Sequence, residues 1–273
     1  MSVALLVLAA ACAAAVPLPE GDAYVRGLVG AQVRREEALS RYSYDVSEVV
    51  EDLDRSGAVR KRRSRDFEVF MVKGRPVQRL VAKDGRPLSG REREQEERRV
   101  RKLADAVAAG KTASELPGVR LAKLLERYRF VATAREEIAG RCAVAFDFAA
   151  LPGDFKIDYD GVMRRLAGRL WVDEEERAVA RVEVRNTSDI KIALGLAVKV
   201  SSLALSAEFT RLETSVWLPR SVETLVIGRK LLLSGLRVRR VASYSNYRRF
   251  EVDVEEEMRD ATPPEAGPPP ELW

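Results

Sequence analysis

Residues 178–200 read AVARVEVRNTSDIKIALGLAVKV, and apolar and charged side chains alternate along them. Val182 and Val184 flank the charged Glu183, and after a polar break the alternation resumes from Ile190. A period of two places successive side chains on opposite faces of a β-strand. The stretch therefore predicts two strands, each with one dry face and one charged face.

Working outward, residues 129–254 divide into eight segments of this kind, separated by turn-forming residues such as Pro152, Gly153 and Asp154. Eight successive strands favour an antiparallel meander. Upstream, we expect three more strands within residues 42–87 and helices over residues 22–39, 91–110 and 117–128. A sheet this wide must curl. The predicted fold class is α+β, a large curved antiparallel sheet that forms an incomplete β-barrel with helices on its concave side.

Two helix starts carry recognisable signals. Asp22 is a candidate N-cap for the first helix, whose apolar stripe begins at Val25. Ser89 and Glu92 have the spacing of a capping box. The helix that follows Ser89 is so rich in charge that we expect a mostly solvated face, supported by pairs such as Glu94 with Arg98.

Composition narrows the function. The chain has 273 residues, of which 46% are hydrophobic and 33% charged, as expected of a folded and highly soluble body. It contains no histidine, which excludes Ser-His-Asp catalysis, Cys-His catalysis and histidine-ligated metals. No loop has the calcium-binding pattern. We expect a protein that is not an enzyme, with no catalytic residue, metal or cofactor.

Carboxylates leave one other reading open, a hydrolase with a general acid and base. The candidates share positions in turns and at strand ends, and nothing in the sequence pairs two of them. They are Asp147, Asp154, Asp158, Asp160 and Asp173.

The N-terminus predicts export. Residues 3–16 form an apolar run too short to span a bilayer, and Ala13 and Ala15 fit the pattern recognised by signal peptidase. We expect a signal peptide over residues 1–15 and a periplasmic protein. Cys12 offers an alternative, because its surroundings loosely resemble a lipobox in which it would be acylated as a membrane anchor. Cleavage near Ala15 would leave Cys142 without a partner, as a small core residue.

The body and the tail differ in composition. Residues 16–254 are expected to form one half-barrel domain, and residues 255–273 a Pro-rich acidic tail without a fold. Near the start of the second strand, basic residues gather in a run that either forms a solvated hairpin end or contacts a membrane surface. They are Arg60, Lys61, Arg62, Arg63 and Arg65. No aromatic platform accompanies them, so we expect no nucleic-acid partner.

The order of elements over residues 24–254 resembles the periplasmic lipoprotein-carrier family, the LolA-like and LolB-like proteins. Two short motifs carry the resemblance: Leu170-Trp171-Val172-Asp173 before an acidic turn, and Trp217-Leu218-Pro219-Arg220 entering a late strand. The resemblance implies an unclosed barrel whose apolar inner side holds acyl chains under a lid of helices. It also implies a role in outer membrane lipoprotein sorting, lipoprotein reception or periplasmic stress sensing.

The leading hypothesis is an exported protein that binds a lipid or an acylated protein on the apolar concave face. Apolar residues at alternate positions of four predicted strands are the candidates for that face. They are Val144, Phe146, Phe148, Leu170, Val172, Val182, Val184, Leu205 and Phe209. The alternative is an envelope sensor or scaffold that binds another protein through its charged outer face. The same nine residues would also serve as plain core.

Overall fold

A computed structural model describes residues 12, 16–110, 127–153, 160–193, 197–212, 216–230 and 234–249. The expected helix over residues 117–128 lies outside this part apart from its last two residues, of which Tyr128 begins a strand. The expected tail lies outside it, as does the signal peptide apart from Cys12. Among the residues described, no helix combines the length and the apolar character needed to cross a bilayer.

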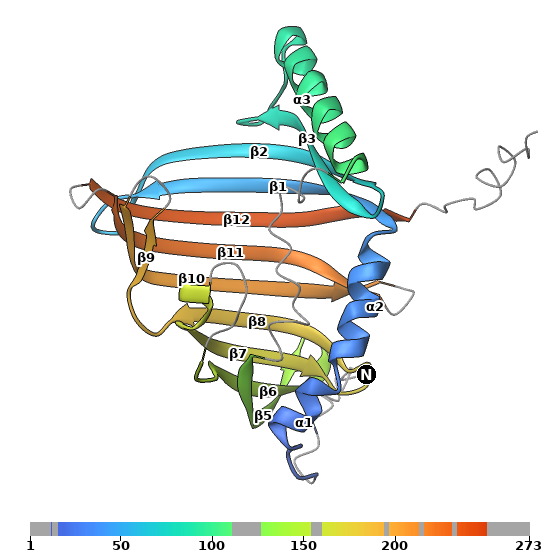
Figure 1. Ribbon diagram of the computed structural model, residues 1–273, viewed down its shortest axis with the longest axis vertical. Helices are drawn as coiled ribbons and strands as arrows, with labels where there is room; N and C mark the ends of the chain where they lie inside the picture. The colour runs from blue at the N-terminus through green and yellow to red at the C-terminus, as the bar shows by residue number, and fades with distance from the viewer. Residues whose placement is uncertain are drawn as a thin grey trace, which may run out of the picture.

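Strands dominate the chain, as Figure 1 shows. They are β1 (Tyr42–Leu53), β2 (Val59–Val72), β3 (Arg75–Lys83), β4 (Arg86–Pro87), β5 (Tyr128–Ile138), β6 (Arg141–Ala150), β7 (Leu166–Asp173), β8 (Ala178–Asn186), β9 (Ile190–Ala193), β10 (Ala197–Arg211), β11 (Trp217–Lys230) and β12 (Ser234–Arg249). The helices are α1 (Gly21–Arg26), α2 (Val29–Leu39), α3 (Gly90–Ala108) and α5 (Asp160–Met163). The eight segments expected after residue 129 correspond to β5 to β12.

All these strands join one antiparallel sheet, in the order β4-β3-β2-β1-β12-β11-β10-β8-β7-β6-β5, with β9 paired to β10. The first strand therefore lies beside the last, with Tyr42 opposite Arg249. The two ends of this order, β4 and β5, are not paired to each other, so the sheet is curved but open. The predicted fold class, an incomplete antiparallel barrel, is confirmed.

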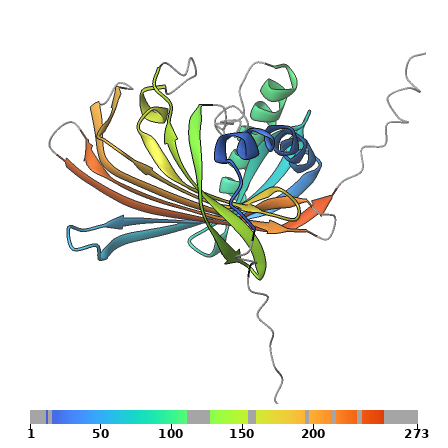
Figure 2. The ribbon, with the colours of Figure 1, turned by 90° about the horizontal axis from the view of Figure 1, so that it is seen from below.

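The sheet has two distinct faces. We call the face toward α1 and α2 the inner face and the opposite one the outer face. Strand register aligns one apolar row across the inner face from β6 to β12: Phe146, Leu170, Val182, Ala207, Val222 and Ala242. Figure 2 shows α1 and α2 on the concave side of the curved sheet.

The opening helix is broken in two. We expected one helix capped by Asp22, but Glu20 is the N-cap residue of α1, and Gly27 and Leu28 separate α1 from α2. The break lies where Leu28 is buried in the main core cluster, so packing of this residue accounts for the position of the break. Asp22 lies in the first turn, where its carboxylate accepts hydrogen bonds from the side chain of Arg26 and from the backbone N–H of Phe130. The expected cap at Asp22 is therefore wrong.

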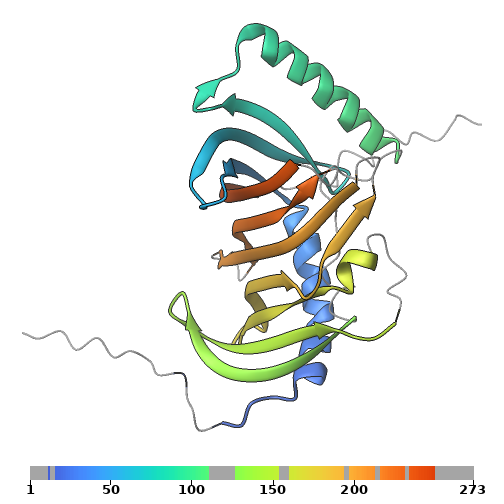
Figure 3. The ribbon, with the colours of Figure 1, turned by 90° about the vertical axis from the view of Figure 1, so that its left-hand side faces the viewer.

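Helix α3 packs at the β3 end of the sheet, far from α1 (Figure 3). Its Val100 and Val107 pack with Phe70 of β2 and Val77 of β3, which lie opposite each other. Phe70 follows Val69, an inner-face residue of β2, so its side chain points to the outer face. This helix therefore covers outer-face side chains, unlike α1 and α2. The capping box predicted at its start is confirmed, since the Ser89 and Glu92 side chains each accept a hydrogen bond from the other's backbone.

Near both ends of the sheet, side chains from helices occupy some of the backbone hydrogen-bonding groups. On β5, the backbone N–H of Phe130 donates to Asp22, with 2.7 Å between N and Oδ1. On β3, the N–H of Leu80 donates to Glu96 at 2.7 Å, and Arg99 donates to the carbonyl of Gln78 at 2.8 Å. Occupied edge groups oppose pairing with another chain. Part of the charge on α3, expected to be solvated, serves this purpose.

Candidate functional site

The nine residues predicted for the concave face all lie on the inner face, but they divide into two groups. Val144, Phe146, Leu170 and Val172 are at most 1% exposed and pack with Val25 and Leu28 in one core cluster. Tyr24 of α1 stacks on Phe146, with ring centroids 5.3 Å apart. These four residues are core in this conformation, and a ligand would reach them only if α1 moved away.

The other five predicted residues, Phe148, Val182, Val184, Leu205 and Phe209, are half-buried. Val182 and Val184 continue into a strip of half-buried apolar side chains that sequence reasoning did not single out. We define the apolar band as Val182, Val184, Leu203, Leu205, Val222, Val226 and Val238, on β8, β10, β11 and β12. Their strands carry apolar residues on both faces, for example Leu225 beside Val226, so alternation alone did not identify the added members.

Where the inner face reaches β12, β1 and β2, charged side chains lie beside a buried apolar cluster formed by Tyr44, Val46, Val69 and Ala242. Ala242 is opposite Glu48, and Glu48 is opposite Arg65. Glu48 is only 3% exposed, and its carboxylate accepts hydrogen bonds from Arg65, with 3.0 Å from Nε to Oε1, and from Arg240. We call Glu48, Arg65 and Arg240 the Glu48 cluster. A buried carboxylate needs such partners.

Tyrosines border the Glu48 cluster. Burial raises the pKa of the Tyr244 hydroxyl, with Arg240 opposing this effect and Glu48 adding to it. Burial likewise raises the pKa of Tyr44, and the two rings lie 6.0 Å apart. A tyrosine hydroxyl is protonated at neutral pH in any case, and the raised pKa keeps both of these hydroxyls available as hydrogen-bond donors at higher pH as well.

A cavity of about 760 Å³ opens on the outer face, not on the face where a hollow was expected. Its lining combines charged residues with small or apolar ones, which include Ala149, Ala167, Ala204 and Leu225. Three of the predicted residues, Phe148, Val184 and Leu205, also border the cavity. Most of the other lining residues are their neighbours along the strands and therefore point to the outer face. The volume falls within the range of small-molecule sites.

Ion pairs surround this cavity. Arg169 Nε lies 2.7 Å from Asp147 Oδ1, and Arg181 pairs with Glu183. Both guanidinium groups also lie over the ring of Trp171, which is 5% exposed within a small cluster on this face. The outer face is thus charged, as predicted, but it holds a buried tryptophan that the alternation did not reveal.

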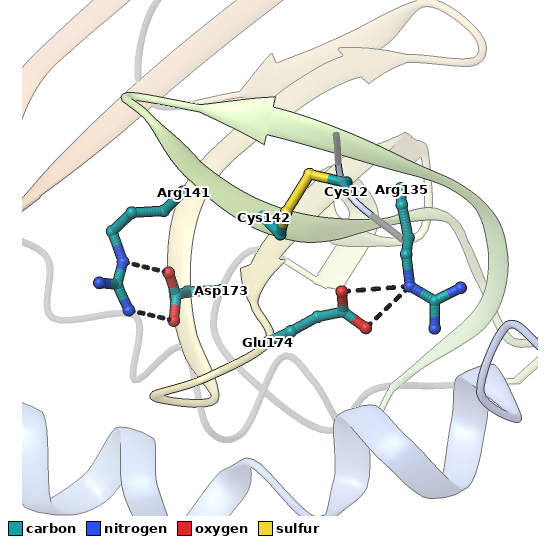
Figure 4. Close-up of a disulfide and its surroundings, with 6 residues drawn as sticks. All are labelled: Cys12, Arg135, Arg141, Cys142, Asp173 and Glu174. Carbon is teal, nitrogen blue, oxygen red and sulfur yellow. Dashed lines mark hydrogen bonds and ion pairs between the residues drawn. A yellow bond between two sulfur atoms is a disulfide. The ribbon is translucent and has the colours of Figure 1, made fainter. Parts of the chain in front are cut away.

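The N-terminal segment is fastened to the sheet near α1 by a disulfide between Cys12 and Cys142 (Figure 4), whose Cα atoms lie 5.4 Å apart. We expected Cys142 to lack a partner only after cleavage near Ala15, and in the chain that retains residue 12 it is bonded to Cys12. The reason is geometric, because Val16 and Pro17, which precede α1, lie beside Arg135 of β5, next to the hairpin that carries Cys142. A cysteine in a disulfide has no free thiol for acylation, so this bond and a lipid anchor at Cys12 exclude each other.

A second attachment holds the same segment. Arg135 donates to the carbonyl oxygens of Val16 and Pro17, and its Nε lies 3.0 Å from Glu174 Oε1. Figure 4 places this pair beside the disulfide. These bonds fix the approach of the chain into α1 and, with it, the cover over the four fully buried residues.

Of the five carboxylates considered for acid and base chemistry, the structure describes the side chains of two, and each of these two is bound to a different arginine. Asp147 pairs with Arg169, and Asp173 is bound by Arg141, with 2.9 Å from Nη2 to Oδ1. Asp154 and Asp158 lie outside the described residues, and the side chain of Asp160 is not described. In the part of the chain that the structure describes, no group of three or more acidic or cysteine side chains is placed to hold a metal ion.

The basic run of β2 is exposed along its length. Arg62 and Arg63 pair with Glu51 and Asp52, and Arg65 belongs to the Glu48 cluster. Arg60 and Lys61 have no ion pair with any residue in the described ranges. The run therefore splits between interstrand pairs and an open cationic end.

Comparison with known proteins gives distant likenesses in structure only. No family model and no curated protein matches the sequence. Similar solved structures include a putative outer membrane lipoprotein-sorting protein domain from Vibrio parahaemolyticus, 11% identical, covering 86% of this chain and 95% of that one at a TM-score of 0.40. A LolA superfamily protein from Nitrosomonas europaea is 12% identical, covering 83% and 96% at 0.29. MucA/MucB from Pseudomonas aeruginosa matches at 13% identity, covering 82% and 99% at 0.25.

Proposed function

We propose that this protein is exported to the cell envelope and binds the acyl chain of a lipid or of an acylated protein on its apolar band, without catalysing a reaction. The observation that carries the proposal is the band itself, apolar side chains left half-buried next to a fully enclosed core. Burying further apolar surface against hydrocarbon contributes about 0.8 kcal/mol for each methylene.

The size of the band supports this ligand. Four neighbouring strands spaced about 4.8 Å apart give a width of about 14 Å. One leaflet contributes half of a hydrocarbon core that is about 30 Å thick, so an acyl chain extends about 15 Å. The band therefore accommodates one chain laid across the strands. Helix α1 lies at its β7 and β8 side, where Val25 and Leu28 close the core.

Two adjacent residues of β11 provide a matched test, because Val226 faces the band and Leu225 faces the outer cavity. Val226→Glu is expected to remove acyl species that copurify with the protein, whereas Leu225→Glu is expected to retain them. Native mass spectrometry and lipid extraction measure this, with thermal unfolding as the check on folding. A wild-type protein repeatedly recovered without acyl species would overturn the proposal, as would loss of lipid in Leu225→Glu alone.

A protein partner on the outer face is the second candidate, favoured by the cavity there and by Val131, which borders it at 55% exposure. A photoreactive residue at position 131 would then crosslink one defined envelope protein, and Leu225→Glu would abolish the crosslink. A crosslink formed equally from position 226 on the opposite face would contradict this candidate. Deleting residues 255–273 separates the roles further, since a lipid carrier has no need of the tail.

A further inference from the structure

Charge on the inner face gathers at one end of the apolar band. Resting on the proposed function, we propose that the Glu48 cluster binds the anionic phosphate headgroup of the lipid whose acyl chain lies on the band. Strand register supports the juxtaposition: Leu205 is opposite Thr224, Thr224 is opposite Arg240, and Arg240 is opposite Val50. The apolar Leu205 on β10 is thus only two strands away from the guanidinium group of Arg240 on β12.

The geometry of the cluster leaves donors available. Glu48 is enclosed, but the side chains of Arg65 and Arg240 remain 51% and 47% exposed. The buried carboxylate orients both guanidinium groups, each of which carries five N–H donors. Arg65 directs Nε and Nη2 to Glu48, so its other donors are free of that carboxylate. Oriented guanidinium groups suit the paired oxygens of a phosphate.

Charge balance distinguishes this cluster from its counterpart on the outer face. There, Glu51 lies between Arg62 at 3.8 Å and Arg239 at 3.5 Å, and Glu223 also pairs with Arg239 at 2.7 Å. Two carboxylates face two guanidinium groups in the outer arrangement. In the inner one, the ion pairs among the described residues set the single carboxylate of Glu48 against two guanidinium groups.

Among the side chains that the structure describes, the neighbours on β1 and β2 do not cancel this excess. On the inner face, Arg63 is opposite Val50 and pairs with Asp52 at 3.0 Å, a balanced pair. Lys61 is opposite Asp52 and is exposed, which adds a further cation at the same end. The cluster therefore has a net positive charge and lies beside an apolar surface. An anionic lipid is complementary to both, because its headgroup is negative and its acyl chain is apolar.

Arg239 and Arg240 supply matched variants, since they are adjacent on β12, similarly exposed and paired with glutamates on opposite faces. The probes are lysophosphatidylglycerol and lysophosphatidylcholine with the same acyl chain, together with inorganic phosphate. We expect the wild-type protein to bind the anionic lysolipid about tenfold more tightly than the zwitterionic one, the scale of one charged hydrogen bond. Arg240→Gln should abolish this preference, Arg240→Lys should retain part of it, and Arg239→Gln should leave it unchanged.

The outcomes separate the two proposals. Equal binding of both lysolipids by the wild-type protein overturns the headgroup site and leaves acyl binding standing. Failure to bind either lysolipid overturns the proposed function itself. Inorganic phosphate binding as tightly as the anionic lysolipid would make a free anion the ligand and contradict the headgroup assignment. If the cluster only joined three strands, Arg240→Gln would lower the unfolding temperature without changing the lipid preference.

Discussion

Cys12 is bonded to Cys142 of β6, although 130 residues separate the two cysteines in the sequence. The bond places the segment before α1 against the sheet, beside the pair formed by Arg135 and Glu174. A covalent attachment at this point restricts α1, which covers the fully buried part of the inner face. Two expectations, one on stability and one on processing, depend on this bond.

Removing the bond should destabilise the protein. A disulfide that closes a long loop typically contributes about 2–4 kcal/mol to the free energy of unfolding. Cys142→Ser is therefore expected to shift the urea midpoint downward, and reductant should have the same effect on the wild-type protein. Cys12→Ser and the double variant serve as controls, because all three variants should be equally stable. Stability unchanged by reductant would contradict this expectation.

The same bond makes a prediction about processing. Cleavage near Ala15 would discard Cys12, so a protein that keeps the disulfide must be cut before residue 12 or not at all. Ala9 and Ala11 also fit the small-residue pattern for signal peptidase, which predicts a mature protein that begins at Cys12. Intact mass and N-terminal sequencing check this. A mature chain starting at Val16, or an acylated Cys12, would show that the bond is absent from the mature protein.

Asp173 should make stability depend on acidic pH. Burial alone would raise the pKa of this carboxyl, but hydrogen bonds from Arg141 and from the Glu176 backbone outweigh it and hold the pKa below its ordinary value of 3.8. A carboxyl whose pKa is lower in the folded state stabilises the protein above the unfolded pKa. That contribution is lost as the pH falls through the lower, folded pKa. Unfolding measured between about pH 2 and pH 6 should show this loss below about pH 4.

Substitutions test that assignment. Asp173→Asn is expected to cost about 3 kcal/mol at neutral pH, because Asp173 is 1% exposed and its partner Arg141 loses a bidentate bond. Asp147→Asn is the control, since Asp147 also pairs with an arginine but its side chain is 51% exposed. Its expected cost is at most about 1 kcal/mol. Equal costs for the two variants would refute the role of burial.

Gly168 should not tolerate alanine. A Cβ atom at this position would lie 1.8 Å from the carbonyl oxygen of Glu183 and 2.8 Å from Cζ of Phe148. The overlap with the Glu183 backbone forces β7 away from β8, and the Phe148 ring must shift as well, at a cost of about 1–3 kcal/mol. Gly235→Ala is the matched control, because no heavy atom lies within 4 Å of its added Cβ. Thermal unfolding of both variants decides the matter, and a neutral Gly168→Ala would contradict the close approach.

Local patterns predicted the elements better than their partners. The alternation around Val182 and Val184 identified the strands and their inner faces, and the spacing of Ser89 and Glu92 identified a helix start. The pairing of β1 with β12 was not predicted, because contacts between the two ends of the chain leave no local periodicity.

The candidate site shows the same division. Glu48 lies between Val46 and Val50 on one face of its strand, but its partner Arg240 is 192 residues away, so the cluster could not be recognised from the sequence. The outer cavity was also missed, because it depends on sheet curvature and on small side chains such as Ala149 and Ala204. Small residues in a strand have no distinctive spacing that marks a hollow.

The position of β12 in the sheet has a consequence for biogenesis. This strand is the last of the sheet in sequence, yet it lies between β1 and β11 and is the element that joins the β1–β4 side to the β5–β11 side. A nascent chain that still lacks residues 234–249 holds two separate groups of strands and no bridge between them. Completion of the sheet must therefore follow synthesis of almost the entire polypeptide, which leaves an interval in which an unfolded chain can be threaded through a translocation channel.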